Sequence, residues 1–166
     1  LVVAKNEAAV ANLVAQFSAH TVEKEYLALV WGAPKPAAGE IRLPVGRHPV
    51  HRKKMAVVGK GRAAVTRYET LAATPLAALL RVRIETGRTH QIRVHLAHLG
   101  HPVAGDAVYG RARRGLPEGL ELPRQMLHAR RLKIAHPRDG RPLEFSAPPP
   151  PDFLAAQTLL AGGACV

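Results

Sequence analysis

Two strand-like segments joined by a short turn, residues 63–73 and 77–85, constrain this chain more than any other feature of its sequence. In the second segment the apolar residues Leu80, Val82 and Ile84 alternate with charged residues. Alternation with a period of two is typical of a strand that buries one face and exposes the other to water. The chain therefore has to build a largely antiparallel sheet with a hydrophobic layer packed against it.

Other segments extend this sheet and cover it. Residues 21–31 become apolar on both faces toward their end, which predicts an inner strand. The remaining predicted strands cover residues 40–45, 55–58, 127–136 and 143–147, the predicted helices cover 7–19, 89–99 and 152–160, and residues 1–4 are predicted to end a buried strand. The predicted fold class is therefore α+β, a mixed and mainly antiparallel sheet with helices packed against it.

The charge of the chain indicates the kind of partner it has. Its 166 residues carry 24 Lys and Arg against 12 Asp and Glu, a formal net charge of +12, which points to a polyanion and most often to a nucleic acid. Only 4% of the residues are aromatic, so a broad platform for stacking bases is not predicted. The basic residues form two clusters along the sequence: Arg42, Arg47, His48, His51, Arg52, Lys53, Lys54 and Lys60, and then Arg111, Arg113, Arg114, Arg124, Arg130 and Arg131.

Membrane and disulfide-rich proteins are excluded as classes. No apolar run approaches the ~18–20 residues that cross a bilayer, and the first residues do not form a signal peptide. Cys165 is the only cysteine, so the chain has no disulfide framework and no cysteine-based metal site. We therefore expect a cytoplasmic protein with no membrane partner, and a monomer as the default state.

The densest group of polar residues is ETGRTHQIRVH, residues 85–95, at the predicted junction of a strand and a helix. Gly87 permits a sharp turn of the backbone there, and Thr89 is suited to cap the helix. The scaffold would then fix Arg88 at the mouth of a cleft. A guanidinium there either binds a phosphate or keeps a carboxyl group ionised, because a neighbouring cation lowers the pKa of an acid by ~1–3 units. The alternative is a local ion pair between Arg88 and Glu85.

Two further patterns have plainer interpretations. A metal site would need an Asp, Glu or Cys among the four histidines between residues 90 and 101, and there is none. We therefore predict no metal, and polar histidines that line a cleft: His90, His95, His98 and His101. Asp106 lies in the glycine-rich GDAVYG, where an aspartate is more often a turn former than a nucleophile.

From residue 1 to about residue 154, the chain resembles the RluA/RluC/RluD-type RNA pseudouridine synthases. The matching stretches are HTVEKEYLALVWG (20–32), GRHPVHRKKMAV (46–57), GKGRAAVTRYE (59–69), ETGRTHQIRVHLAHLGHPVAGDAVYG (85–110), RQMLHARRLKIAHP (124–137) and PLEFSAPPPPDF (142–153). The stretch at 85–110 is highly specific. The basic stretch and RQMLHA are most similar to the RluD branch, whose members modify uridines in large-subunit (23S) ribosomal RNA.

The resemblance implies a reaction and a partner. Members of the family isomerise uridine to pseudouridine in RNA without a cofactor: the glycosidic bond breaks, the uracil turns, and it rejoins through carbon. Their nucleophile is an Asp in an HRLDxxTSG motif that would end immediately before LVVAKN, so it is not among these 166 residues. The resemblance thus implies that residues 1–154 are the C-terminal portion of a catalytic domain, lacking the HRLD segment. Residues 155–166 would be the end of a helix and a frayed tail, and we expect the chain to be inactive by itself.

The resemblance also implies roles for individual residues. Tyr26 matches the tyrosine that stacks on the target uracil and is a candidate base, although strand propensity alone would make it an ordinary strand aromatic. Arg88 matches the arginine that pairs with the nucleophilic carboxylate. Ile92 and Leu127 would be apolar walls of the base pocket. The residues expected to bind RNA are Arg47, His51, Arg52, Lys53, Lys54, His90 and Arg93.

Two other functions compete with this one. A non-catalytic RNA-binding module would keep the same fold and have lost the chemistry. A small metal-dependent hydrolase would use the histidines and would need a bound metal. The sequence that precedes Leu1 in the gene separates enzyme from binder, because only the enzyme requires an in-frame HRLD segment.

Overall fold

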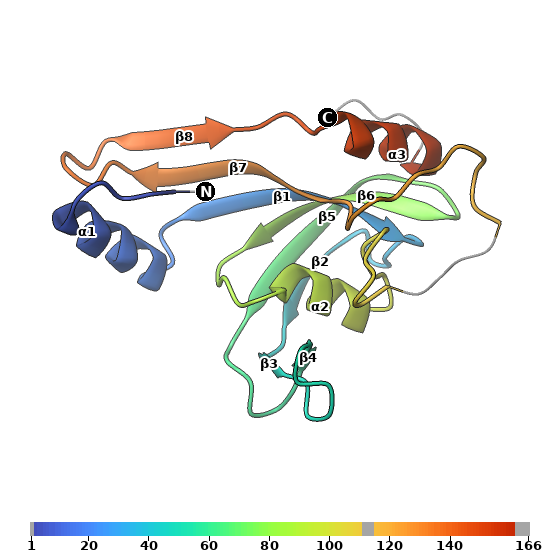
Figure 1. Cartoon of the computed structure of the whole chain (residues 1–166), viewed down its shortest axis with the longest axis horizontal. Coiled ribbons are helices and arrows are strands. Elements are labelled where there is room, and N and C mark those ends of the chain that lie inside the picture. Colours follow the sequence, from blue (N-terminus) through green and yellow to red (C-terminus); the bar gives the residue numbers. More distant parts are fainter. Residues whose placement is uncertain (1, 111–114, 162–166) are drawn as a thin grey trace.

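The computed structural model describes residues 2–110 and 115–161, and within them a central sheet, a small hairpin and three helices (Figure 1). The strands are β1 Glu23–Trp31, β2 Ala38–Arg42, β3 Val45–Arg47, β4 Met55–Val57, β5 Val65–Ala73, β6 Ala77–Ile84, β7 Leu127–Ala135 and β8 Pro142–Ser146. The helices are α1 Glu7–Ser18, α2 Gln91–His98 and α3 Pro151–Ala161. The central sheet has the order β2-β5-β6-β1-β7-β8, and β3 pairs with β4.

The predicted α+β class and its mainly antiparallel sheet are confirmed. All pairings between the described strands are antiparallel, so the parallel pairing implied by a mixed sheet is not seen among them. The hairpin predicted from residues 63–85 is β5 and β6. Val82 and Leu80 are fully buried in β6, whereas Arg83 is exposed, as the alternation predicted.

Strand β1 is an inner strand of the sheet, between β6 and β7, as predicted. One of its faces packs Leu27 and Leu29 against Phe153 of α3. The other packs Ala28 and Val30 into a cluster that includes residues of α2. The two helices therefore cover opposite faces, and α2 is held on the face to which Tyr26 belongs.

Several boundaries differ from the sequence-based predictions for identifiable reasons. Residues 2–4 form no strand, and Val3 is 73% exposed, because no described strand pairs with them. The strand predicted over 40–45 is divided into β2 and β3, since Pro44 lies between them and has no N–H to donate. The tail at 162–166 lies outside the described residues.

Helix α1 places Val10, Leu13, Val14 and Phe17 on one face, as its spacing predicts, but the chain covers only part of that face. Leu13 is buried, whereas the other three side chains are 41–58% exposed. Asn6 caps the helix by accepting a hydrogen bond from the Ala9 N–H at 2.9 Å. An apolar helix face is therefore left beside the sheet, at the end where β7 and β8 lie (Figure 1).

Candidate functional site

The turn that carries Arg88 is built around one buried side chain, Gln91. Its Oε1 accepts hydrogen bonds from the Thr86 hydroxyl at 2.7 Å and from the Arg88 backbone N–H at 3.0 Å. Its Nε2 donates to the Val65 carbonyl at 2.9 Å and to the Thr66 hydroxyl at 3.0 Å. The glutamine thus ties the end of β6 and the start of α2 to β5, and it fixes the backbone at Arg88.

This network also explains why α2 begins later than predicted. Thr89 does not cap the helix; the N-cap is His90, in a left-handed conformation with φ +56° and without a side-chain cap hydrogen bond. Gln91 serves the turn instead, because its carbonyl oxygen takes the Arg88 N–H. The buried His95 continues the network from Thr66 to the Leu43 carbonyl, both at 2.9 Å. Burial lowers the pKa of His95, so the ring is neutral at pH 7.

Replacing Gln91 by methionine is expected to destabilise the protein by at least about 2 kcal/mol. The change keeps the side-chain length but leaves buried donors and acceptors without partners, at about 1–3 kcal/mol for each unsatisfied group. Urea unfolding followed by circular dichroism measures the effect. A loss below about 0.5 kcal/mol, the range of ordinary surface substitutions, would contradict a central role for this side chain.

The guanidinium of Arg88 has no carboxylate partner among the described residues. Its Nε donates to the Ala63 carbonyl at 3.1 Å, and the side chain is half-buried. The alternative ion pair with Glu85 is wrong, because Glu85 pairs with Arg67 on β5 instead. A cation held by a rigid turn is therefore left to bind an anion from elsewhere.

Three of the predicted pocket residues lie in one hydrophobic cluster. Ile92 is buried in it, and Tyr26 and Leu127 are half-buried against it. Burial raises the pKa of the Tyr26 phenol, so this hydroxyl keeps its proton at neutral pH. Arg88 lies in the turn that leads into α2, four residues before Ile92, and its guanidinium is bonded to the Ala63 carbonyl. That Arg88 acts together with this cluster stays a prediction.

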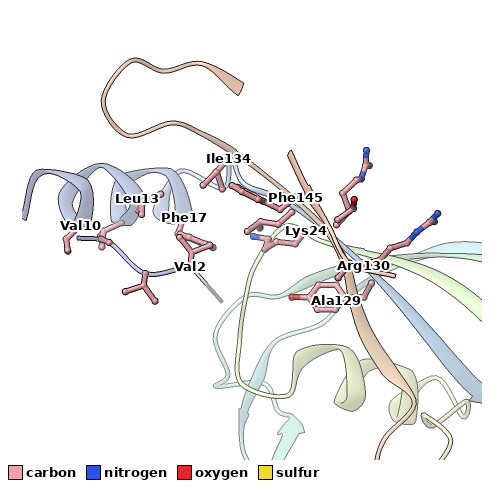
Figure 2. A pocket seen from close by; sticks show the side chains of 17 residues that line it. Val2, Val10, Leu13, Phe17, Lys24, Ala129, Arg130, Ile134 and Phe145 are labelled. Atoms are coloured by element: carbon pink, nitrogen blue, oxygen red, sulfur yellow. The ribbon is translucent and has the colours of Figure 1, made fainter. Parts of the chain in front are cut away.

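Tyr26 also lines a groove with a volume of about 820 Å³ between α1 and the strands β1, β7 and β8. Figure 2 shows the side chains around it, which are mainly apolar. Phe17 of α1 and Phe145 of β8 line it and are 41% and 52% exposed. Lys24 lies over the Phe17 ring, 5.7 Å from its centroid, and donates to the Glu85 carbonyl at 3.0 Å. The groove is therefore mainly apolar, with the cations Lys24, Arg130 and Arg131 and the Tyr26 phenol on its sheet side.

Most of the first basic cluster, from Arg47 to Lys54, lies on the hairpin of β3 and β4 and the loop between them, which we call the basic hairpin (residues 45–57). Of the other two members, Arg42 ends β2 and Lys60 follows β4. Arg47, His51, Arg52 and Lys53 are exposed, as an RNA-binding role requires. Lys54 is half-buried and donates to the Val108 carbonyl at 3.0 Å. The hairpin is separate from the central sheet and lies beside α2 (Figure 1).

Like Lys54, two further residues predicted to bind RNA, Arg93 and His90, have side-chain partners within the protein. Arg93 makes a two-pronged ion pair with Asp106, with both N–O distances 2.7 Å, and its side chain is only 12% exposed. His90 Nδ1 lies 2.9 Å from the Tyr109 hydroxyl. Asp106 is a loop former, as predicted, since it also accepts the backbone N–H groups of Val108 and Tyr109. That Arg93 and His90 contact RNA stays a prediction.

The second basic cluster of the sequence is not a free cationic patch where the structure describes it. Arg124 pairs with Asp152 at 2.8 Å. Arg130 and Arg131 both approach the buried Glu25, at 3.7 and 3.3 Å. Residues 111–114, which include the other three arginines, lie outside the described residues. Acids distant in the sequence thus offset charges that look isolated along the chain.

Sequence reasoning missed three residues that organise this region. Gln91 and Tyr109 lie inside stretches that the sequence marked, but a glutamine or tyrosine carries no signal of its role until its partners are known. Glu25 is the third: it is 7% exposed in its side chain and lies within 4 Å of Arg81, Arg83, Arg130 and Arg131. Its position opposite Arg83 in the strand register was the available signal.

Neither a metal centre nor a membrane span emerges in the part of the chain that the structure describes. No group of three or more His, Cys, Asp or Glu side chains is placed to hold a metal ion there. No described helix has the length and hydrophobicity to cross a membrane.

Comparison with known proteins matches residues 1–98 to the family described as RNA pseudouridylate synthase. An uncharacterized RNA pseudouridine synthase of Mycobacterium bovis is 50% identical over 162 residues, which cover 98% of this chain and 52% of that protein. Ribosomal large subunit pseudouridine synthase D of Nitrosomonas europaea is 46% identical over 158 residues, covering 93% of this chain and 46% of that protein. The solved structure of human RNA pseudouridylate synthase domain containing 1 is similar with a TM-score of 0.75 and 30% identity, over 95% of this chain and 66% of that one. The chain thus spans about half the length of the bacterial relatives.

Proposed function

Because the chain belongs to the RNA pseudouridylate synthase family, we propose that it is part of an enzyme that isomerises uridine to pseudouridine in large-subunit ribosomal RNA, in the cytoplasm. The names of relatives such as the Nitrosomonas europaea protein support the RNA class. The observation that carries the proposal is the guanidinium of Arg88. The Arg88 backbone N–H is held by Gln91, the side-chain Nε donates to the Ala63 carbonyl, and the guanidinium has no carboxylate partner among the described residues.

In this proposal Arg88 pairs with a nucleophilic aspartate supplied by a segment outside these 166 residues. The guanidinium would lower the pKa of that carboxyl and keep it ionised. Tyr26 would stack on the extruded uracil with its phenol protonated, and base–aromatic stacking is worth ~1–3 kcal/mol. Ile92 and Leu127 would form the apolar walls of the base pocket. Residues 1–154 are then the C-terminal portion of the catalytic domain.

The groove beside α1 supports the same division of the domain. Its apolar side chains, Val10, Val14, Phe17 and Phe145, are each 41–58% exposed. Exposed apolar patches rimmed by polar residues are typical of surfaces that another segment or partner covers. We propose that a further part of the same catalytic domain packs here and brings its aspartate toward Arg88 and Tyr26.

The basic hairpin is the proposed contact to the RNA backbone. Arg47, His51, Arg52 and Lys53 are exposed together on it, and cations at such a surface neutralise phosphates and release counterions. Binding to RNA should therefore weaken steeply as salt is raised. Shape and the extruded base would set the site, since few aromatic residues are available to stack on others.

The experiment compares the 166-residue chain with a longer protein that contains it together with an HRLD segment. We expect the longer protein to form pseudouridine in transcribed large-subunit ribosomal RNA, measured by mass spectrometry of the digested nucleosides. We expect the 166-residue chain to bind that RNA and to form none. Pseudouridine formed by the 166-residue chain would contradict the expectation that the nucleophile lies outside it. RNA binding without isomerisation by either protein would favour a non-catalytic RNA-binding module.

A further inference from the structure

The GDAVYG loop, residues 105–110, contacts the basic hairpin directly, and the proposed function gives it no role. The Tyr109 hydroxyl accepts a hydrogen bond from the Met55 backbone N–H at 2.9 Å. The Val108 carbonyl accepts one from the Lys54 ammonium at 3.0 Å. Met55 begins β4, immediately after the exposed cations of the hairpin. The loop therefore contacts the hairpin at the start of β4, directly after its run of basic residues.

The same tyrosine contacts the start of α2. Its hydroxyl lies 2.9 Å from His90 Nδ1, and its ring meets the imidazole edge-on. Since the hydroxyl oxygen accepts from Met55, its own proton is available to His90 Nδ1 in the tautomer protonated on Nε2. Burial lowers the pKa of His90, and the charge of Arg93 adds to this effect while Asp106 opposes it, so the imidazole is neutral at pH 7. One hydroxyl thus links hairpin and helix.

The position of Tyr109 is itself fixed by buried charge. Asp106, whose side chain is fully buried, accepts the Tyr109 backbone N–H at 3.0 Å and both prongs of Arg93 from α2. The Arg93 guanidinium lies 5.0 Å from the centroid of the Tyr109 ring. The loop closes so tightly that a Cβ at Gly110 would overlap the Asp106 carbonyl oxygen. Contacts with Asp106 and with Arg93 of α2 therefore fix the position of Tyr109 independently of its bond to the hairpin.

We propose that Tyr109 is a positioning residue that docks the basic hairpin on α2 and so sets where its cations meet RNA relative to the turn of Arg88. The inference rests on the proposed function, because it assumes that the hairpin contacts RNA. β3 and β4 pair over only three positions and belong to a sheet of their own, and they meet α2 through a small hydrophobic cluster that contains Val94 and Tyr109. Within that contact the Tyr109 hydroxyl supplies the directional bonds. Without the hydroxyl, the exposed Arg52 and Lys53 would be presented over a wider range of orientations.

The test replaces Tyr109 by phenylalanine in the 166-residue chain. The ring and its packing remain, while the hydroxyl that joins Met55 to His90 is lost. We expect faster hydrogen exchange at the Met55 amide, and an affinity for transcribed large-subunit ribosomal RNA that falls about three- to tenfold, the effect of one or two hydrogen bonds. Tyr68→Phe is the matched control, because it removes a tyrosine hydroxyl that bonds the Pro36 carbonyl at 3.3 Å in another part of the sheet. It should change neither quantity.

A second background separates docking from a general loss of structure. The double variant Arg52→Ala, Lys53→Ala lacks the two cations whose position the docking is proposed to fix. In that background Tyr109→Phe should therefore cause no further loss of RNA affinity. An undiminished cost in that background, or unchanged affinity in the single variant, would overturn the proposal. If the parent chain binds no RNA, the proposed function fails instead. The exchange rate at Met55 then still decides whether Tyr109 docks the hairpin.

Discussion

Replacing Arg88 by alanine in the full-length enzyme is expected to lower the rate of pseudouridine formation by about three orders of magnitude. In the proposed mechanism the substitution leaves a nucleophilic carboxylate without its counter-charge in a partly buried site. Removing one partner of a buried ion pair costs about 3–5 kcal/mol, and each 1.36 kcal/mol of lost transition-state stabilisation is a factor of ten in rate. Single-turnover kinetics on transcribed large-subunit ribosomal RNA measures the chemical step apart from binding.

The controls for Arg88 separate chemistry from folding. In the 166-residue chain, which lacks the proposed aspartate, the guanidinium bonds only the Ala63 carbonyl among the described residues, so Arg88→Ala should change the melting temperature of that chain little. Arg88→Lys keeps the charge but not the planar fork and should retain part of the rate. Arg141→Ala, at a turn where the side chain is 67% exposed, should leave the rate unchanged. A near-normal rate for Arg88→Ala would remove the pairing role and, with it, the observation on which the proposed function depends.

The sequence predicted those parts of the fold that depend on periodicity. The alternation in residues 77–85 and the end of 21–31, which is apolar on both faces, indicate which faces of each strand are buried. The strands β6 and β1 were therefore predicted correctly. Helix α1 was predicted with its apolar face, but spacing cannot say what covers that face. Val10 and Val14 are therefore exposed although they follow the helical pattern.

The parts of the candidate site that the sequence did not predict depend on pairings across the fold. Arg88 and Glu85 are three residues apart, so an ion pair between them was the alternative to a functional Arg88, but Glu85 pairs instead with Arg67 of β5. From the sequence Arg93 was expected to bind RNA, but in the folded protein its guanidinium is paired with Asp106. Opposite charges meet through tertiary structure, so a count of cations along the sequence overestimates how many are available to RNA.

Replacing Asp106 by asparagine is expected to destabilise the protein by about 3–5 kcal/mol, because it removes the charged partner of Arg93 from a buried pair. The asparagine amide keeps an oxygen that can accept the backbone N–H groups of Val108 and Tyr109. The loss of unfolding free energy therefore measures the contribution of the ion pair. Asp139→Asn is the control: that carboxylate also lies beside an arginine, Arg141, but it is 51% exposed, and exposed pairs contribute at most about 1 kcal/mol. Urea unfolding of the three proteins measures the difference.

The pH dependence of the same comparison identifies the carboxylate itself. Burial of Asp106 opposes its ionisation, but hydrogen bonds from Arg93 and from the Tyr109 and Val108 N–H groups outweigh burial and hold its pKa below the ordinary value. A carboxyl group with a lowered folded-state pKa adds stability above the unfolded-state pKa of about 3.9 and loses it as the pH falls through the folded-state value. Asparagine has no such dependence. The gap in unfolding free energy between the parent and Asp106→Asn should therefore be constant from pH 7 to about pH 5 and should narrow below about pH 4. A gap that stays constant to pH 2.5 would mean that the charge of Asp106 is not what stabilises the loop.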